Sequence, residues 1–521
     1  MVETARPSPR PVLGVWALLC LVTNLPYARA WLLPPRGTRF LGFFYAIPDV
    51  FNYLSYVQQA EHGALLFFNK LYPLPHAASL ANLEWSVVGW LSAALGSQPA
   101  LAYRVFGAAV TLALVLATDR WLRLAGLPGD HRFAALLLVF TGGGLGGVLF
   151  LRLGPPAWRF LDLTSGMYPF ISVLVNPHFA AGTALLLWAL WAFHRARDLG
   201  GELLAVLLGS CLVLVRPYEL ALLVGIRGLV VLTTQPWRRW LRLLLPLAAL
   251  APAVLYGWST TVRNPAYAVF SAVGYGLPPA ADILLALLPA GVLALAGVPL
   301  LRGAHGLPER VAFATLLAWP VTVAAVLALP LRFGLQLAVD VGLPLLGLVA
   351  LALARFRPAV TLAAALLLCS TSAVALELLL EDNPQWYVPR ERIEAAEALR
   401  PLCRRGELLV APPDIGLYAN AYSACRAYAA HLGTADSRER AAAIRAFYAA
   451  PPAGRLAWLE ARCARFVVLP DDGERAPHLL GAAAPYHRVA QASGPTGRLA
   501  VYASDEPPAC PPGAPAAATP Q

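Results

Sequence analysis

One expected helix near the start of the chain presents a carboxylate, an amide and two phenols on a single face. Asp49, Asn52, Tyr53 and Tyr56 recur at i, i+3, i+4 and i+7, and residues with this spacing share one side of an α-helix. We expect this helix over residues 48–63, because a proline stands in its first turn and a glycine at its end. The carboxylate can accept a proton from a hydroxyl group, and the amide and phenols can position the molecule that carries it. We interpret Asp49 as the candidate catalytic base; the alternative is an ordinary first-turn aspartate that stabilises its own helix.

Further ionisable residues stand at the ends of long apolar runs. Charged groups at membrane depth cost free energy unless they pair or line a wet cavity, so each one is a candidate for substrate binding. His178 could donate to a phosphate, and Arg216 with Glu219 could contact substrate; the alternatives are a structural histidine and an ion pair that holds helices together. Arg332 could instead snorkel to the interface or pair with Asp340. The candidate substrate-binding residues are Asn52, Tyr53, Tyr56, Arg159, Asp162, His178, Arg216, Tyr218, Glu219 and Arg332.

Other motifs in the sequence do not support phosphate-loop or metal chemistry. The glycine run of residues 142–147 lacks the Lys-Ser/Thr pair of a phosphate loop and lies in an apolar segment, so close helix packing explains it better. We find no His-Glu-x-x-His, Gly-x-Ser-x-Gly or Walker pattern. The cysteines never have Cys-x-x-Cys spacing, which argues against a zinc site.

The composition predicts that these residues belong to a polytopic membrane protein. Over 521 residues, the hydrophobic content of 58% and the mean hydropathy of +0.61 exceed the range of soluble globular chains, and the charged content of 13% lies below it. The net charge of +11 comes largely from arginines between apolar runs. It therefore indicates orientation in a lipid bilayer, and we expect no nucleic-acid partner.

The apolar runs predict a mainly α-helical domain, residues 1–382, with about eleven spans. They lie at residues 12–33, 99–118, 133–151, 173–193, 202–215, 219–233, 241–257, 283–301, 310–329, 335–354 and 358–379. With the N-terminus in the cytoplasm, the arginine-rich connections fall inside, as the positive-inside rule requires. Residues 34–98 then form a long first outer loop of an inner (plasma) membrane protein. The short runs beside Arg216 read best as a hairpin that turns at Pro217; a single broken helix is the alternative.

Residues 383–510 predict a small α/β domain on the outer (periplasmic or extracellular) side. Its expected helices lie at 391–403, 437–449 and 456–464, its strands at 407–411 and 466–469, and a terminal hairpin at 486–491 and 498–503. We interpret the arginine-rich stretch 438–445 as a solvated helix face. An oxidising compartment would permit disulfides in this domain, with the pairing left open, among Cys403, Cys425, Cys463 and Cys510. We expect the Ala/Pro-rich tail, 511–521, to be disordered.

The chain resembles the GT-C class of integral-membrane glycosyltransferases and looks most like uncharacterised bacterial members of that class. The resemblance covers nearly the whole chain and includes a carboxylate in a long first outer loop, many spans and a C-terminal outer domain. The motifs that carry it are the helix at 48–63, Tyr103-Arg104, Asn176-Pro177-His178-Phe179, Arg216-Pro217-Tyr218-Glu219 and Tyr387-Val388-Pro389-Arg390.

This resemblance implies an inverting enzyme that moves a sugar from a polyprenyl-phosphate donor to a glycan, lipid or protein acceptor at the outer membrane face. By this analogy Asp49 would accept the proton of the acceptor hydroxyl, while His178, Arg216 or Arg332 would balance the departing phosphate. Many members carry two adjacent acidic residues in the first loop, whereas Val50 follows Asp49 here. That departure favours a metal-free mechanism over one with a divalent cation.

Two other classes of function compete with the transferase. Intramembrane Arg, Glu and Asp residues could line the path of a transporter or lipid flippase, although the sequence has no internal repeat of the kind many transporters show. A non-catalytic envelope assembly protein would use its outer domain to bind partners. An Asp49→Asn variant that folds normally separates the enzyme from this scaffold.

Overall fold

The structure is a computed structural model whose contacts divide the chain into two compact units. It describes residues 8–72, 76–154, 160–196, 198–272, 277–301, 306–329, 334–383, 385–431, 434, 436–471, 480 and 485–504. The first unit comprises Met1–Ala28, Arg104–Trp258 and Gly274–Glu381, and the second comprises Arg29–Tyr103, Ser259–Val273 and Asp382–Gln521. The segment predicted as the first outer loop therefore shares a compact unit with the C-terminal segment.

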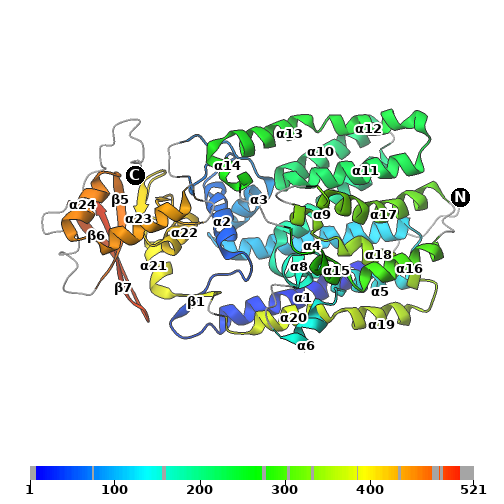
Figure 1. Ribbon diagram of the computed structural model, residues 1–521, viewed down its shortest axis with the longest axis horizontal. Coiled ribbons are helices and arrows are strands. Elements are labelled where there is room, and N and C mark those ends of the chain that lie inside the picture. Colours follow the sequence, from blue (N-terminus) through cyan, green and yellow to red (C-terminus); the bar gives the residue numbers. More distant parts are fainter. Residues whose placement is uncertain are drawn as a thin grey trace. The chain divides into compact units, whose positions relative to one another are not determined.

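Long apolar helices form most of the first unit (Figure 1). In the described part of the chain, five helical segments are long and apolar enough to cross a membrane by themselves. They are α1 (Arg10–Leu32), α4 (Pro99–Leu124), η3 (Pro217–Glu219) with α11 (Leu220–Thr234), α17 (Leu307–Leu327), and η7 (Gly334–Ala338) with α18 (Gly342–Leu353). A shorter apolar helix, α10 (Leu199–Val215), precedes η3.

Five further apolar segments are helix pairs that bend by more than 40° at a short break. The largest bend, 110°, lies at Asn176 between α8 and α9, where Pro177 cannot donate a backbone hydrogen bond. The helices of these pairs are η1 (Gly129–His131) and α5 (Arg132–Thr141) with α6 (Gly146–Leu153), α7 (Leu161–Thr164) and α8 (Pro169–Val175) with α9 (Pro177–Arg195), η4 (Trp237–Arg239) and α12 (Trp240–Ala248) with α13 (Ala251–Trp258) and the π-helix η5 (Ser259–Arg263), α15 (Ala280–Leu287) with α16 (Ala290–Gly297), and α19 (Pro358–Leu368) with α20 (Ser370–Leu380). Counting each pair once gives up to ten spans among the described residues, so the predicted number of about eleven stays a prediction.

The predicted polar helix exists as α2 (Ile47–Glu61) in the second unit. It packs against α3 (Leu83–Ala94), whose N-cap Asn82 accepts a hydrogen bond from the backbone N–H of Trp85 at 3.1 Å. The two helices approach closely at Gly89, where a Cβ atom would lie 2.4 Å from Cβ of Ala60. Before the C-terminal segment, the described residues also form the short helix α14 (Pro265–Ala272) and the 3₁₀ helix η6 (Val298–Leu301).

The C-terminal segment folds around a five-stranded sheet in the order β4-β3-β5-β7-β6. Strands β4, β3 and β5 run parallel, whereas β5, β7 and β6 are antiparallel. A separate two-stranded sheet joins β1 (Thr38–Phe40) to β2 (Tyr387–Pro389). The remaining elements are α21 (Arg390–Ala398), β3 (Leu408–Val410), α22 (Pro413–Tyr422), β4 (Arg426–Ala427), α23 (Ser437–Ala449), α24 (Pro452–Glu460), β5 (Ala464–Pro470), β6 (Tyr486–Gly494) and β7 (Gly497–Ser504).

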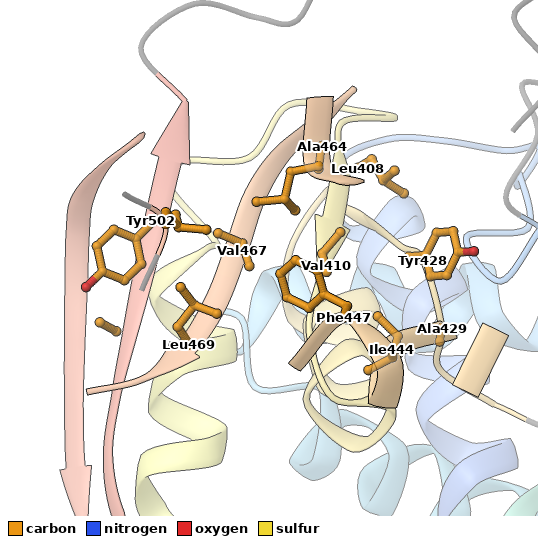
Figure 2. Close-up of a cluster of buried hydrophobic side chains, with 13 residues drawn as sticks. Leu408, Val410, Tyr428, Ala429, Ile444, Phe447, Ala464, Val467, Leu469 and Tyr502 are labelled. Carbon is orange, nitrogen blue, oxygen red and sulfur yellow. The ribbon is translucent and has the colours of Figure 1, made fainter. Parts of the chain in front are cut away.

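An apolar core holds this sheet to α23. Ile444 and Phe447 of the helix pack near Val410 and Val467 of the parallel strands (Figure 2). The predicted α/β character, the helix at 437–449 and the terminal hairpin are confirmed. The predicted helix at 456–464 was placed too late, because Pro452 fits the first turn of α24 and Ala464 already belongs to β5.

The C-terminal segment contains disulfides, which the sequence permitted without fixing their pairing. Cys403 bonds to Cys425, with their Cα atoms 5.4 Å apart. Cys463 is disulfide-bonded as well, whereas Cys510 lies outside the described residues. Because disulfides persist in oxidising compartments, this bonding is consistent with the predicted outer location.

Candidate functional site

Asp49 lies in the first turn of α2 and pairs with a histidine from the C-terminal segment. Its Oδ1 atom is 3.2 Å from Nε2 of His431, and the two side chains are 36% and 10% exposed respectively. The helix begins here because Ala46 adopts a left-handed conformation (φ 44°) and Pro48 fits the first turn. This close contact with the imidazole of His431 orients the carboxylate. Within the described part of the chain Oδ2 accepts no hydrogen bond, so it is available to take a proton.

The other residues of the predicted polar face pack inside the second unit. Tyr53 stacks on Trp85 with ring centroids 4.5 Å apart, and Tyr56 stacks on Phe67 at 5.7 Å. Asn52 is buried, and its Oδ1 has no hydrogen-bond partner among the described residues. Burial raises the pKa of the Tyr56 phenol, which therefore stays neutral. These contacts hold α2 in place, while substrate binding by the three residues stays a prediction.

A cavity of about 900 Å³ is lined by Pro48, the residue before Asp49, and by His431, the partner of Asp49; it is here called the Asp49 cavity. Its wall combines the aromatic rings of Phe44, Trp386 and Tyr418 with charged side chains of α22 and α23. Burial raises the pKa of Tyr418, so its phenol stays a neutral hydrogen-bonding group. Apolar walls with a few placed polar groups are typical of small-molecule sites, and this volume lies in their usual range.

A lysine that the sequence did not single out supports α2. Lys70 is the only lysine in the chain and is completely buried. Its Nζ donates to Oε1 of Gln58 (2.8 Å) and to the carbonyl oxygens of Asn420 (2.8 Å) and Ser423 (2.6 Å). Burial lowers its pKa to about 7. Lys70 thus joins α2 to the end of α22, and the beginnings of both helices line the Asp49 cavity. The one feature of the sequence that could have pointed to it is that the chain has a single lysine.

In the first unit, Arg216 and Glu219 form a fully buried ion pair. Nε of Arg216 donates to the hydroxyl of Tyr218 at 3.1 Å, and Nη2 donates to the carbonyl oxygen of Gln336 at 3.2 Å. The guanidinium also lies over the ring of Phe179, 4.9 Å from its centroid. The motif therefore joins several helices, as the alternative interpretation expected, and its contact with substrate stays a prediction.

Asp340, noted above as a possible partner of Arg332, is buried beside two hydroxyl groups. It accepts hydrogen bonds from Ser172 Oγ (2.7 Å) and Thr183 Oγ1 (2.5 Å). Its backbone has a positive φ of 55°, and its N–H donates to the carbonyl oxygen of Gly166. The Asp340 carboxylate is thus satisfied by hydroxyl groups of α8 and α9.

The glycine run packs against Asp162, another predicted binding residue. The Asp162 carboxylate accepts hydrogen bonds from the backbone N–H of Gly146 (2.8 Å) and from Oγ1 of Thr371 (2.9 Å). A Cβ atom on Gly146 would lie 2.0 Å from Oδ1 of Asp162, and one on Gly143 would lie 2.5 Å from Cβ of Thr371. The prediction that close packing explains residues 142–147 is confirmed, and a role of Asp162 in binding substrate stays a prediction.

The remaining predicted cations cannot be combined with Asp49 into one geometry. His178 is buried at the start of α9, 7% exposed. Arg159 and Arg332 lie outside the described residues. Asp49 belongs to the second unit, whereas His178 and Arg216 belong to the first. The convergence of these groups on one site therefore stays a prediction.

A second cavity, of about 890 Å³, lies elsewhere in the second unit and is lined by equal numbers of arginines and glutamates. Arg39 pairs with Glu397 at 2.7 Å, and Arg400 pairs with Glu61 at 3.0 Å. Most of its positive charge is thus neutralised by neighbouring carboxylates.

No set of three or more His, Cys, Asp or Glu side chains that could hold a metal ion occurs in the described ranges. Among the described side chains of these types, His431 is the one that pairs with Asp49. Metal dependence is therefore a question for activity measurements.

Comparisons with known proteins bear on the fold. No family model and no curated protein matches the chain. The structure of ArnT from Cupriavidus metallidurans bound to undecaprenyl phosphate aligns with a TM-score of 0.53 and 13% identity, covering 95% of this chain and 98% of that one. The apo state of the same protein gives 0.51 and 13%, covering 94% and 97%.

A third solved structure, the Archaeoglobus fulgidus oligosaccharyltransferase in complex with Zn and sulfate, aligns with a TM-score of 0.46 and 14% identity, covering 94% of this chain and 73% of that one. At such low identities a likeness concerns the fold, and the two ArnT alignments span almost the full length of both chains. The resemblance predicted from the sequence is confirmed at this level: the chain has the fold of GT-C-type membrane glycosyltransferases.

Proposed function

We propose that the protein is a membrane glycosyltransferase that moves a sugar from a polyprenyl-phosphate donor to an acceptor hydroxyl at the outer membrane face. The observation that carries this proposal is the Asp49–His431 pair beside a cavity of about 900 Å³, in a chain with a GT-C fold. The carboxylate is partly exposed and oriented by a histidine, as a general base requires. ArnT, with undecaprenyl phosphate bound, supports a polyprenyl-linked donor.

In the proposed reaction the acceptor oxygen attacks the anomeric carbon of the sugar. The bond from that carbon to the phosphate oxygen breaks, and the polyprenyl phosphate leaves with the electron pair. The acceptor proton passes to Oδ2 of Asp49, while Nε2 of His431 stays in contact with Oδ1. Attack opposite the leaving group inverts the anomeric configuration.

The departing phosphate needs positive charge nearby. Of the three cations proposed for this role, Arg216 is already neutralised by Glu219. The proposal therefore assigns the role first to His178 and Arg332.

The test is an Asp49→Asn variant in a deletion strain. Asparagine keeps the volume and a hydrogen-bond acceptor for His431 but cannot take up the proton, so we expect transfer to fall by about 100-fold or more. Mass spectrometry of envelope glycans and lipid-linked sugars measures the product. Asp130→Asn is the matched control, because the Asp130 side chain is 69% exposed and lies in the other unit. Unchanged glycans in a well-folded Asp49→Asn strain would favour the non-catalytic assembly protein.

A further inference from the structure

Two arginines in the wall of the Asp49 cavity have no carboxylate partner among the residues that the structure describes. Arg438 and Arg445 lie two turns apart on α23, and both line the cavity. Neither forms an ion pair with any residue that the structure describes. In the second cavity, by contrast, Arg39 and Arg400 are bound to glutamates. The Asp49 cavity therefore has uncompensated positive charge.

The fold holds these arginines toward the cavity. Arg438, Ala441 and Arg445 recur at i, i+3 and i+7 and share one face of α23, and all three line the cavity. Phe447 lies on the opposite face and Ile444 beside it, and both pack into the sheet core (Figure 2). Since the core fixes the helix, the arginine face is preorganised. The arginine-rich stretch is more than the solvated face expected from the sequence.

The helix N-termini around the cavity also favour a negatively charged ligand. The N-terminal residues of α2, α22 and α23 all line it, and helix N-termini carry partial positive charge. One carboxylate, Asp414, also lines the cavity, but it forms an ion pair with Arg392. The helix dipoles thus add to the field of Arg438 and Arg445.

The position of the cavity in the chain indicates which substrate it suits. Every lining residue falls within residues 44–48 or 385–445, and none comes from the apolar helices that could cross a membrane. A polyprenyl chain needs an apolar environment at membrane depth. The cavity instead offers aromatic rings and cations, which suit a sugar ring with an anionic group.

We propose that the acceptor of the transfer carries a phosphate or carboxylate group, which Arg438 and Arg445 bind while a hydroxyl of the same molecule meets Asp49. This inference rests on the proposed function, because only a transferase has an acceptor. The anion site itself rests on the cavity and its unpaired arginines.

The test measures binding of three small sugars to the purified full chain in detergent by calorimetry. Glucose 6-phosphate and glucuronic acid carry the two candidate anions, and glucose carries neither. We expect at least one anionic sugar to bind about 10- to 100-fold more tightly than glucose, and Arg438→Gln/Arg445→Gln to remove that difference. Arg36→Gln/Arg498→Gln is the matched control, since it removes the same charge from exposed sites outside the cavity. Arg438→Lys/Arg445→Lys should restore part of the binding.

The outcomes separate this inference from the proposed function. Equal binding of all three sugars, no binding of either anion, or full anion binding by the Arg438→Gln/Arg445→Gln protein overturns the anionic acceptor. Loss of glycans in the Asp49→Asn strain would then still support transfer to a neutral acceptor. Conversely, arginine-dependent anion binding with unchanged Asp49→Asn glycans would leave an anion site without the proposed transfer.

Discussion

At the scale of residues, the candidate base is held by a group from the other end of the chain. Asp49 could be identified in the sequence because it belongs to a periodic polar face at a helix start. His431 could not, because its 3.2 Å contact with Asp49 depends on how the C-terminal segment folds against α2. Sequence spacing carries no signal for such a contact.

We predict that His431 acts as a positioning residue for Asp49. His431→Ala removes the imidazole that lies 3.2 Å from the Asp49 carboxylate, so transfer should fall by about 10- to 100-fold. His431→Gln should recover part of the loss, because its amide can donate to Oδ1. Glycan mass spectrometry of complemented strains measures both, with the exposed His487→Ala as control. Equal loss in the Ala and Gln variants would contradict positioning by a hydrogen bond.

Buried polar partners were the least predictable part of the candidate site. Arg332 was one possible partner of Asp340 in the sequence, and the described partners of Asp340 are Ser172 and Thr183. The hydroxyls of Ser and Thr give no pattern in an apolar run, although they satisfy a buried carboxylate well. The sequence shows that a carboxylate lies in an apolar run, but its hydrogen-bond partners depend on how the helices pack.

At the scale of elements, helices with clear end signals were predictable and helices made by packing were not. The helix at 48–63 and the helix at 437–449 correspond to α2 and α23. By contrast, α22 was missed because its sequence holds Gly416, Asn420 and two tyrosines, which are weak helix formers. Tertiary contacts stabilise it: Phe51 of α2 meets Tyr418 with ring centroids 5.0 Å apart.

Lys70 should make the junction of α2 and α22 depend on pH. Its pKa of about 7 lies below the 10.5 of an exposed lysine. Below pH 7 both folded and unfolded chains hold the proton; between pH 7 and 10.5 the unfolded chain holds more of it. The free energy of unfolding should therefore rise with pH in this window, by up to about 1.4 kcal/mol per pH unit.

Thermal midpoints of the purified full chain between pH 6 and 10 measure this effect. Lys70→Met is the reference variant, since methionine is of similar length and does not titrate. We expect the midpoint of the wild type to gain on that of Lys70→Met as pH rises above 7. Parallel curves for the two proteins would show that Lys70 keeps an ordinary pKa.

At the scale of the whole molecule, composition predicted the membrane class and hydropathy located the helices. Helices account for every predicted apolar run, but five of them are bent pairs. A hydropathy window counts apolar residues and does not detect a break such as the one at Asn176. Contacts also join residues 29–103 to the C-terminal segment, for example in the pairing of β1 with β2. Such pairing between distant segments has no local signature.

The sidedness of the chain is the last prediction. Arginines gather in the connections predicted to be cytoplasmic, and the disulfide of Cys403 and Cys425 favours an oxidising compartment for the C-terminal segment. Alkaline phosphatase, which needs disulfides, should be active when fused after Glu381 and inactive when fused after Arg239, with the reverse for green fluorescent protein. The reverse pattern would place the candidate base in the cytoplasm, where a GT-C reaction at the outer face could not use it.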